Sequence, residues 1–419
     1  MDYPRFGRRS DREPDEAQSG LYREEMMRAK TPLELAALAT AAVPGLKVAG
    51  LRPPQYCDEV TSVTGLVDTA GNAWTVTCPH STVGGLDLDS ESGVLARLAK
   101  ATDAKRIPFD VPRIHGTTLT PQGDRVIVHQ DLGGRPMEDS DFDDPHILPA
   151  SLGKALAALH NLPEVVYTGI HLPAYTAAEC RDRHLALLDE AAGQILIPAN
   201  LWNRWEAALD DVSLWRFAPA PIHGDLQGNA VIVSSGAITA MTGFSSAHVG
   251  DPATDIAWVL AQASDVFLDR FREAYSRERA HTDLKLFTRA QLVSELAIIR
   301  WLVHGLHAED RSIISQARQM LTDLSTDLGD DQLVARQRPI TIPVPAPDHA
   351  DAHNADPEST DTIPDGILAQ AVGPAAPSAQ DGPFVDESPR PRTGRLRIVS
   401  DEDASTERLE LDDHGNHAP

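Results

Sequence analysis

The sequence predicts an α+β fold of two lobes, a small and mainly β N-terminal lobe followed by a larger helical C-terminal lobe. Three observations predict it. Short apolar runs separated by turn residues dominate residues 46–130, as is typical of strands. Amphipathic runs with helical spacing dominate residues 152–328. From about Gln337 the sequence becomes rich in proline, alanine, aspartate and serine, which predicts a disordered acidic tail.

The N-terminal lobe is predicted to open with a helix. Thr31 suits the N-cap and Pro32 the first turn, so we expect a helix over residues 31–40. A Gly-Asn pair at residues 71–72 predicts a tight turn between two strands. The remaining expected elements are strands at residues 46–51, 60–68, 73–78 and 126–130 and a helix at residues 86–98.

The C-terminal lobe is predicted to be built mainly from amphipathic helices. Their leucines recur at helical spacing, so that each helix presents one apolar face to a core. The expected helices span residues 152–162, 181–192, 201–212, 266–278, 288–309 and 312–328.

The stretch from residue 221 to residue 260 organises the sequence. It contains His-Gly-Asp-Leu at residues 223–226 and two apolar runs around a Ser-Ser-Gly turn at residues 234–236, which predict a hairpin. It ends with Gly-Asp-Pro-Ala-Thr-Asp-Ile-Ala-Trp at residues 250–258. The Asp-Pro step predicts a helix start. Asp is a favoured N-cap residue, and the N–H that Pro lacks would have no partner in the first turn of a helix.

These segments resemble the aminoglycoside phosphotransferase and choline-kinase-like families, which share the protein-kinase architecture. The signature of those families is His-Gly-Asp-Leu-x-x-x-Asn, a hairpin, Ile-Asp-aromatic and Gly-Asp-Pro-x-x-Asp-Leu-Ala. The resemblance covers about residues 31–335. It implies a kinase-like fold and transfer of a phosphoryl group from ATP to an alcohol. Asp225 would then accept the proton of the hydroxyl group, while an Asn and a second Asp would hold Mg²⁺.

The sequence departs from this pattern at the metal positions. Aligned without a gap, the metal-binding Asn falls on Ala230 and the metal-binding Asp on Gly243. Asn229 lies one residue early, and a shift by one residue in extended chain points a side chain to the opposite face. A local deletion would let Asn229 serve instead. Otherwise no metal site is expected.

The nucleotide positions depart as well. Thr77 stands where the families carry a basic residue for the ATP phosphates, so its usual helix partner, Glu91, is expected on a solvated face. Residues 131–136 are the expected hinge. By resemblance, Gln130, Leu132 and Asn229 are the residues that would bind a nucleotide cofactor.

Three further polar residues are expected to be structural. His160 ends a predicted helix and should pack and cap there. Asp251 should cap a helix, whereas Asp255 should accept hydrogen bonds within the loop around His223 and Asp225.

Composition narrows the possible partners. The formal net charge of −25 argues against nucleic acid as the main partner. No apolar run has the length of a membrane helix, and the first residues show no secretory signal. Three widely spaced cysteines suit reduced thiols, so we expect a cytoplasmic protein. The expected organisation is a flexible segment at 1–30, lobes at 31–131 and 132–335, and a disordered acidic tail at 336–419.

Two functions remain open. The first is a degenerate, pseudokinase-like module with weak or no ATP-dependent phosphoryl transfer, which binds a metabolite or a protein partner. The second is an active kinase that uses ATP, Mg²⁺ and Asp225 to phosphorylate a hydroxyl group of an antibiotic or metabolite. The replacements at Thr77, Ala230 and Gly243 favour the first, because losing one preorganised electrostatic group typically costs about 10²–10³ in rate. The sequence identifies neither a substrate nor a partner.

Overall fold

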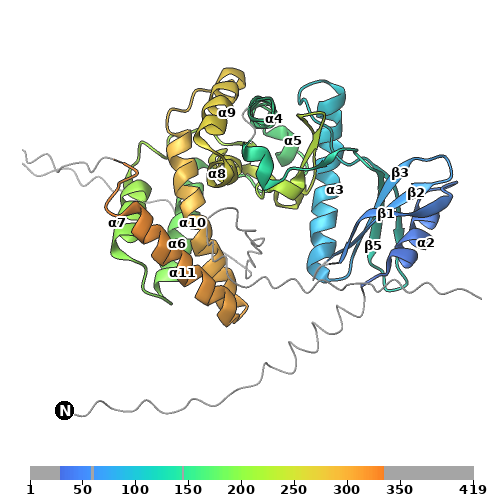
Figure 1. Ribbon diagram of the computed structural model, residues 1–419, viewed down its shortest axis with the longest axis horizontal. Helices are drawn as coiled ribbons and strands as arrows, with labels where there is room; N and C mark the ends of the chain where they lie inside the picture. The colour runs from blue at the N-terminus through green and yellow to red at the C-terminus, as the bar shows by residue number, and fades with distance from the viewer. Residues whose placement is uncertain (1–28, 58–60, 144–145, 335–419) are drawn as a thin grey trace, which may run out of the picture. The chain divides into compact units, whose positions relative to one another are not determined.

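The computed structural model of the protein describes residues 29–57, 61–143 and 146–334. The expectations of a flexible N-terminal segment and of a disordered acidic tail concern residues outside this description. Within it, a β-sheet lobe is followed by a helical lobe, which confirms the α+β, kinase-like bilobal fold (Figure 1). The residue boundaries proposed for the lobes stay a prediction.

The N-terminal lobe is one antiparallel sheet with strand order β1-β2-β3-β5-β4. A reciprocal capping box between Thr31 and Glu34 starts its first helix at the predicted place. Helices α2 and α3 lie on opposite faces of the sheet (Figure 1). The elements are α2 (Pro32–Ala42), β1 (Val48–Cys57), β2 (Thr61–Asp68), β3 (Ala73–Pro79), α3 (Thr82–Asp103), β4 (Ile114–Leu119) and β5 (Arg125–Gln130).

The side chains of β3 point alternately to the two faces of the sheet. Trp74, Val76 and Cys78 are buried in the cluster that also contains the apolar side chains of α2. Because successive side chains of a strand point to opposite faces, Thr77 lies on the face away from α2. This is the position at which the resemblance expects a basic residue.

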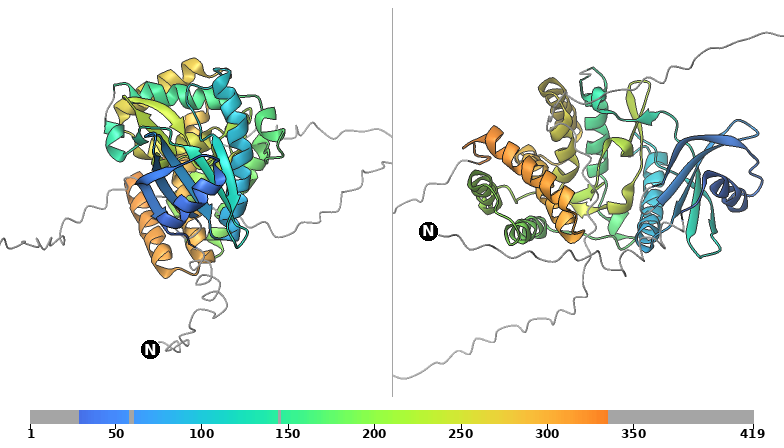
Figure 2. Two further views of the ribbon diagram at one scale, coloured as in Figure 1. Left: turned by 90° about the vertical axis from the view of Figure 1, so that its right-hand side faces the viewer. Right: turned by 60° about the horizontal axis from the view of Figure 1, so that its bottom comes forward.

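The C-terminal lobe is mainly helical, as predicted. Its helices are α4 (Leu148–His160), α5 (Val165–Thr168), α6 (Ala177–Ala192), α7 (Ala199–Asp210), α8 (Ala253–Gln262), α9 (Asp265–Glu278), α10 (Leu286–His307) and α11 (Arg311–Leu328). Helix α10 packs against α8 and α6, and α11 lies along it (Figure 2). The long helix thus joins the elements around the loop of residues 223–230 to the outer helices. No helix of the described part of the chain has both the length and the apolar character needed to cross a membrane.

Short strands and 3₁₀ turns lie between the loops of the C-terminal lobe. The strands are β6 (Arg135–Pro136), β7 (Ala220–Ile222), β8 (Val231–Ser234), β9 (Ala237–Met241) and β10 (His248–Gly250). The 3₁₀ turns are η1 (Asp139–Asp143), η2 (Gly228–Ala230) and η3 (Phe244–Ser246). β8 and β9 form the predicted hairpin, with positive φ at Ser235 and Gly236 in its turn. Leu226 and Val231 are buried in the core that includes α4, α8 and α9, so the loop between β7 and β8 is fixed at both ends.

Candidate functional site

The loop between β7 and β8 is held by one buried carboxylate. Asp255 accepts hydrogen bonds from the backbone N–H of His223 at 2.8 Å and of Gly224 at 2.9 Å, as the sequence predicts. Gly224 has φ +87°, and a Cβ there would stand 2.2 Å from the carbonyl oxygen of Ser246. Only glycine therefore fits between the loop and its neighbour.

Asp255 continues into a buried network. Nε2 of His160 lies 3.0 Å from its carboxylate, and Nδ1 of His160 lies 2.8 Å from the hydroxyl of Tyr275. His160 is packed as predicted, but its ring connects α4 to α8 and α9 and makes no cap. Burial raises the pKa of Asp255, but the hydrogen bond and charge of His160 and those of His223 outweigh it, so the pKa lies below its usual value.

Asp225 follows this anchored segment and is half-buried. Nε2 of Gln227 lies 3.1 Å and 3.3 Å from the two carboxylate oxygens, and the backbone N–H of Asp225 faces Nδ1 of His223 at 3.4 Å. Burial raises the pKa of Asp225, while Gln227 opposes the rise. A carboxylate so placed can accept a proton from a nearby hydroxyl group. Sequence reasoning missed Gln227, although its position two residues after Asp225 was the available signal.

The alignment without a gap gives the metal-binding positions to Ala230 and Gly243, and in the structure these two residues lie on neighbouring chain segments. The backbone N–H of Thr242 donates to the carbonyl oxygen of Ala230 at 2.9 Å, which joins the two chain segments. A Cβ built on Gly243 would stand 3.8 Å from Cβ of Ala230 and 4.0 Å from Cε1 of His223. Neither position has a side-chain oxygen. Among the described residues, no group of three His, Cys, Asp or Glu could hold a metal ion. These residues do not fit a Mg²⁺ site.

Asn229 lies on η2 with an exposed side chain. No described contact joins Asn229 to Gly243. Together with Trp258 and Gln262 of α8, Asn229 lines a small cavity. Its proposed role as a nucleotide ligand stays a prediction.

Glu91 is not on a solvated helix face, and that expectation is wrong. Its Oε1 accepts hydrogen bonds from the backbone N–H groups of Gly243 and Phe244, both at 3.0 Å. Gly243 has φ +77°, and the chain there turns these two N–H groups toward α3. Burial raises the pKa of Glu91, and the two hydrogen bonds partly offset the rise. Thr77 is half-buried on β3 and supplies no charge.

The hinge begins directly after β5. Gln130 ends that strand with an exposed side chain, and Leu132 is half-buried. Asp131 donates its backbone N–H to the carbonyl oxygen of Ala73 at 2.9 Å, and its carboxylate pairs with Arg52 at 2.6 Å. These contacts fix the hinge, whereas nucleotide binding by Gln130 and Leu132 stays a prediction.

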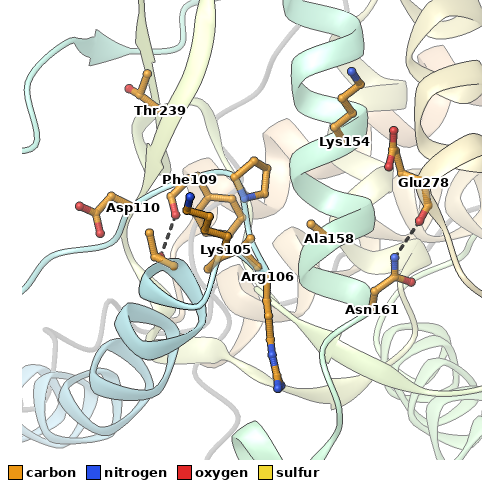
Figure 3. Close-up of a pocket in the computed structure, with 12 residues that line it drawn as sticks. Lys105, Arg106, Phe109, Asp110, Lys154, Ala158, Asn161, Thr239 and Glu278 are labelled. Carbon is orange, nitrogen blue, oxygen red and sulfur yellow. Dashed lines mark hydrogen bonds between the residues drawn. The ribbon is translucent and has the colours of Figure 1, made fainter.

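A cavity of about 700 Å³ opens elsewhere, between the end of α3, α4 and β9. Its lining includes Lys105, Arg106 and Lys154 but neither Asp225 nor Glu91. The charged ends of these three side chains point in different directions (Figure 3). They do not converge on one anion, so the loop between β7 and β8 is the better candidate site.

Comparison with known proteins gives one family. Residues 66–291, more than half of the chain, match the profile of the phosphotransferase enzyme family. One curated relative is the uncharacterized protein YcbJ of Bacillus subtilis (strain 168), which is 24% identical over 204 residues. The match covers 45% of this chain and 62% of the relative, so the chain spans less than two thirds of that protein's length.

Solved structures of phosphotransferases show the same fold. The apoenzyme of macrolide 2'-phosphotransferase MphH from Brachybacterium faecium is 21% identical, with a TM-score of 0.59, and the match covers 68% of this chain and 97% of that one. The GDP complex of aminoglycoside 2'-phosphotransferase-IIIa is 16% identical, with a TM-score of 0.59, and the match covers 71% and 99%. At identities of 21% and 16%, the similarity to these two structures shows a shared fold and no more.

Proposed function

The chain belongs to the phosphotransferase enzyme family, and from this premise we propose that it is a degenerate, pseudokinase-like member with weak or no ATP-dependent phosphoryl transfer. Its role is to bind a metabolite or a protein partner. The observation that supports the proposal most strongly is that Ala230 and Gly243 lie side by side and that neither has a side-chain atom able to bind a metal ion.

The chemistry of phosphoryl transfer gives this observation its weight. Catalysis of that reaction rests on positioning and on neutralising the charge of the phosphates, and metal ions supply most of the neutralisation. The positions in question carry a methyl group at Ala230, a hydrogen at Gly243 and a hydroxyl at Thr77. Each lost group typically costs about 10²–10³ in rate. The losses are not simply additive, yet together they leave little catalysis.

The loop around these positions is nevertheless firmly held. Asp255 fixes His223 and Gly224, and Glu91 fixes Gly243 and Phe244. Protein side chains thus hold both segments without help from an ion. Such a scaffold suits recognition of a ligand, and it supports a binding role.

A second candidate is an active kinase with ATP and Mg²⁺ as cofactors. One observation favours it, because Asp225 is retained, half-buried and oriented by Gln227. This candidate requires a rearranged η2 that brings Asn229 toward Gly243.

Thermal unfolding with ATP and Mg²⁺ separates the two candidates. A ligand that binds the native state at 100 times its Kd stabilises by about 2.7 kcal/mol, which raises the melting temperature. We expect no Mg²⁺-dependent rise at millimolar ATP. A clear rise, with turnover of about 1–100 s⁻¹ as in ordinary kinases, would overturn the proposal. Asp225→Ala would then have to abolish the activity.

A further inference from the structure

The cavity between the end of α3, α4 and β9, called the basic cavity below, has a positively charged rim. Lys105 and Arg106 come from the turn after α3 and Lys154 from α4, and all three side chains are exposed (Figure 3). None of the three makes an ion pair or a side-chain hydrogen bond with the residues that the structure describes. Arg279 adds a cation beside this rim, since it donates to Oδ1 of the lining residue Asn161 at 2.7 Å.

Two acidic residues also line the basic cavity, but they do not cancel its charge. Asp110 is already paired with Arg113, at 3.2 Å. Among the described lining residues, Glu278 is then left to oppose the three cations of the rim. The chain as a whole has a formal net charge of −25, so this positive surface is unlike the average of the protein. Surfaces that recognise each other carry complementary charge, and this one therefore indicates an acidic partner.

The arrangement of the cations is unsuited to a small anion and suits an extended chain. Their charged ends point in different directions (Figure 3). A peptide with carboxylates spaced along its length can pair with the cations in turn, which a single phosphate or carboxylate group cannot do. Pro108 is exposed and Ala158 half-buried in the same lining, so aliphatic side chains of such a peptide also find an apolar surface.

The chain itself contains a peptide of this kind. Residues 401–413, called the acidic segment below, include seven acidic residues and one arginine, whereas residues 348–387 have nine acidic residues spread over 40 positions. Leu409 and Leu411 alternate with the acidic residues near its end. Residues 335–400 separate it from Val334, the last described residue. An extended chain spans up to about 3.3–3.6 Å per residue, so length does not prevent the segment from reaching the basic cavity.

We propose that the acidic segment docks on the basic cavity of its own chain. Its carboxylates pair with Lys105, Arg106 and Lys154, and its leucines cover the apolar part of the lining. Exposed ion pairs are individually weak, so the contact depends on several of them together. The tether makes docking intramolecular, and it therefore needs less affinity than a free peptide would. The contact goes beyond the proposed function and does not depend on what the loop of residues 223–230 binds.

Zero-length cross-linking of the full chain with a carbodiimide tests the proposal, because this reagent joins a carboxylate to a lysine amine only where the two touch. Trypsin cleaves after Arg397 and Arg408, so two tryptic peptides identify the acidic segment by mass spectrometry. We expect both peptides on Lys105 and Lys154. In 1 M NaCl the Debye length falls to about 3 Å, and the yield of these cross-links should fall with it.

Two other lysines of the same chain are internal controls. Lys47 and Lys285 are exposed but do not line the basic cavity. Their cross-links to the acidic segment should be at least about tenfold less abundant than those of the rim lysines. Arg106→Gln removes a rim charge without removing a lysine, so it should lower the yield at the rim lysines about twofold or more. Arg216→Gln, at an exposed position outside the cavity, is the matched control and should leave the yield unchanged.

Unfolding curves establish that each variant is folded before the yields are compared. Equal yields at the rim lysines and the control lysines would overturn the proposal, as would rim cross-links that come from residues 348–387. An equal loss in the two arginine variants would overturn it too. The reaction is repeated on an equal mixture of isotopically heavy and light chains. Rim cross-links that join heavy to light chains in proportion to the mixture would show docking between copies and contradict the intramolecular contact.

Discussion

Oε1 of Glu91 lies 3.0 Å from the backbone nitrogen of Gly243, so a carboxylate of α3 holds the loop that follows β9. The same oxygen accepts the N–H of Phe244. In families that resemble this chain, the corresponding acid is expected to pair with a basic residue on the third strand. Here Thr77 offers no charge. Glu91 instead accepts hydrogen bonds from the backbone at Gly243, the position at which the related families carry a metal-binding Asp.

This contact predicts a pH dependence of stability. Burial raises the pKa of Glu91 above its usual 4.5. Between that value and the higher native pKa, the folded protein binds a proton that the unfolded chain does not bind. The contribution of Glu91 to stability therefore rises as the pH falls through this window. Glu91→Gln, which keeps an acceptor oxygen without the charge, should remove this contribution.

The measurement is urea unfolding of parent and variant at about pH 5, 6 and 7. The stability gained between pH 7 and pH 5 should be larger in the parent than in Glu91→Gln. Glu91→Ala is the control for the hydrogen bonds, and it should lose about 1–3 kcal/mol because two N–H groups lose their acceptor. Identical pH profiles for parent and Glu91→Gln would contradict the prediction.

A buried ion pair gives a second prediction. Glu295 on α10 accepts two hydrogen bonds from Arg204 on α7, at 2.8 and 3.0 Å, and a third from Trp205 at 2.8 Å. Both charged side chains are buried. Glu295→Ala leaves the Arg204 charge without its partner, so we expect a loss of about 3–5 kcal/mol in the free energy of unfolding.

A surface pair serves as the control for this measurement. Glu273 pairs with Arg277 one turn along α9, and both side chains are exposed. Exposed pairs contribute about 0–1 kcal/mol, so Glu273→Ala should change little. A loss of less than 1 kcal/mol in Glu295→Ala would show that Arg204 finds another partner.

Local patterns explain which parts of the fold could be predicted. The capped start of α2 and the hairpin of β8 and β9 depend on residues close in sequence, and both were placed correctly. β4 was missed because its sequence, Ile-His-Gly-Thr-Thr-Leu, shows no clear apolar alternation. The start of α3 at Thr82 was placed too late, since a Gly pair and acidic residues obscure its first turns.

The candidate site could be predicted only in part for a similar reason. The acceptor role of Asp255 follows from a sequence motif, and the structure confirms it. The contact of Glu91 with Gly243 joins residues 152 positions apart, and no pattern in either segment indicates it. The cavity beside Asn229 likewise depends on how η1 and α8 pack.

The cysteines give a third prediction. Cys57 is exposed, whereas Cys78 and Cys180 are buried. Burial raises the pKa of Cys78 to about 11 and that of Cys180 to about 12, so little thiolate is present at neutral pH. A thiol reagent should therefore modify one cysteine rapidly in the native protein and three after denaturation. Rapid native modification of a Cys57→Ser variant would contradict this assignment.

The final prediction tests the altered metal and phosphate positions directly. Thr77→Lys, Ala230→Asn and Gly243→Asp together place a cation and two oxygen ligands where the related families carry them. The main structural risk is Gly243, because its φ of +77° costs a side chain roughly 1–2 kcal/mol. Space is not the obstacle, since the nearest atoms to an added Cβ are 3.8 Å and 4.0 Å away.

Electrostatics determines how this triple variant should behave. The carboxylate added by Gly243→Asp lies near Glu91, whose pKa burial already raises, and near His223 and the loop that carries Asp225. Two close carboxylates repel each other, so the variant should be less stable without a divalent cation and regain stability with Mg²⁺. ATP should then raise the melting temperature only when Mg²⁺ is present, and only in the variant. If the variant folds but shows neither response, Ala230 and Gly243 are not the metal positions, and the register on which the proposed loss of catalysis rests is wrong.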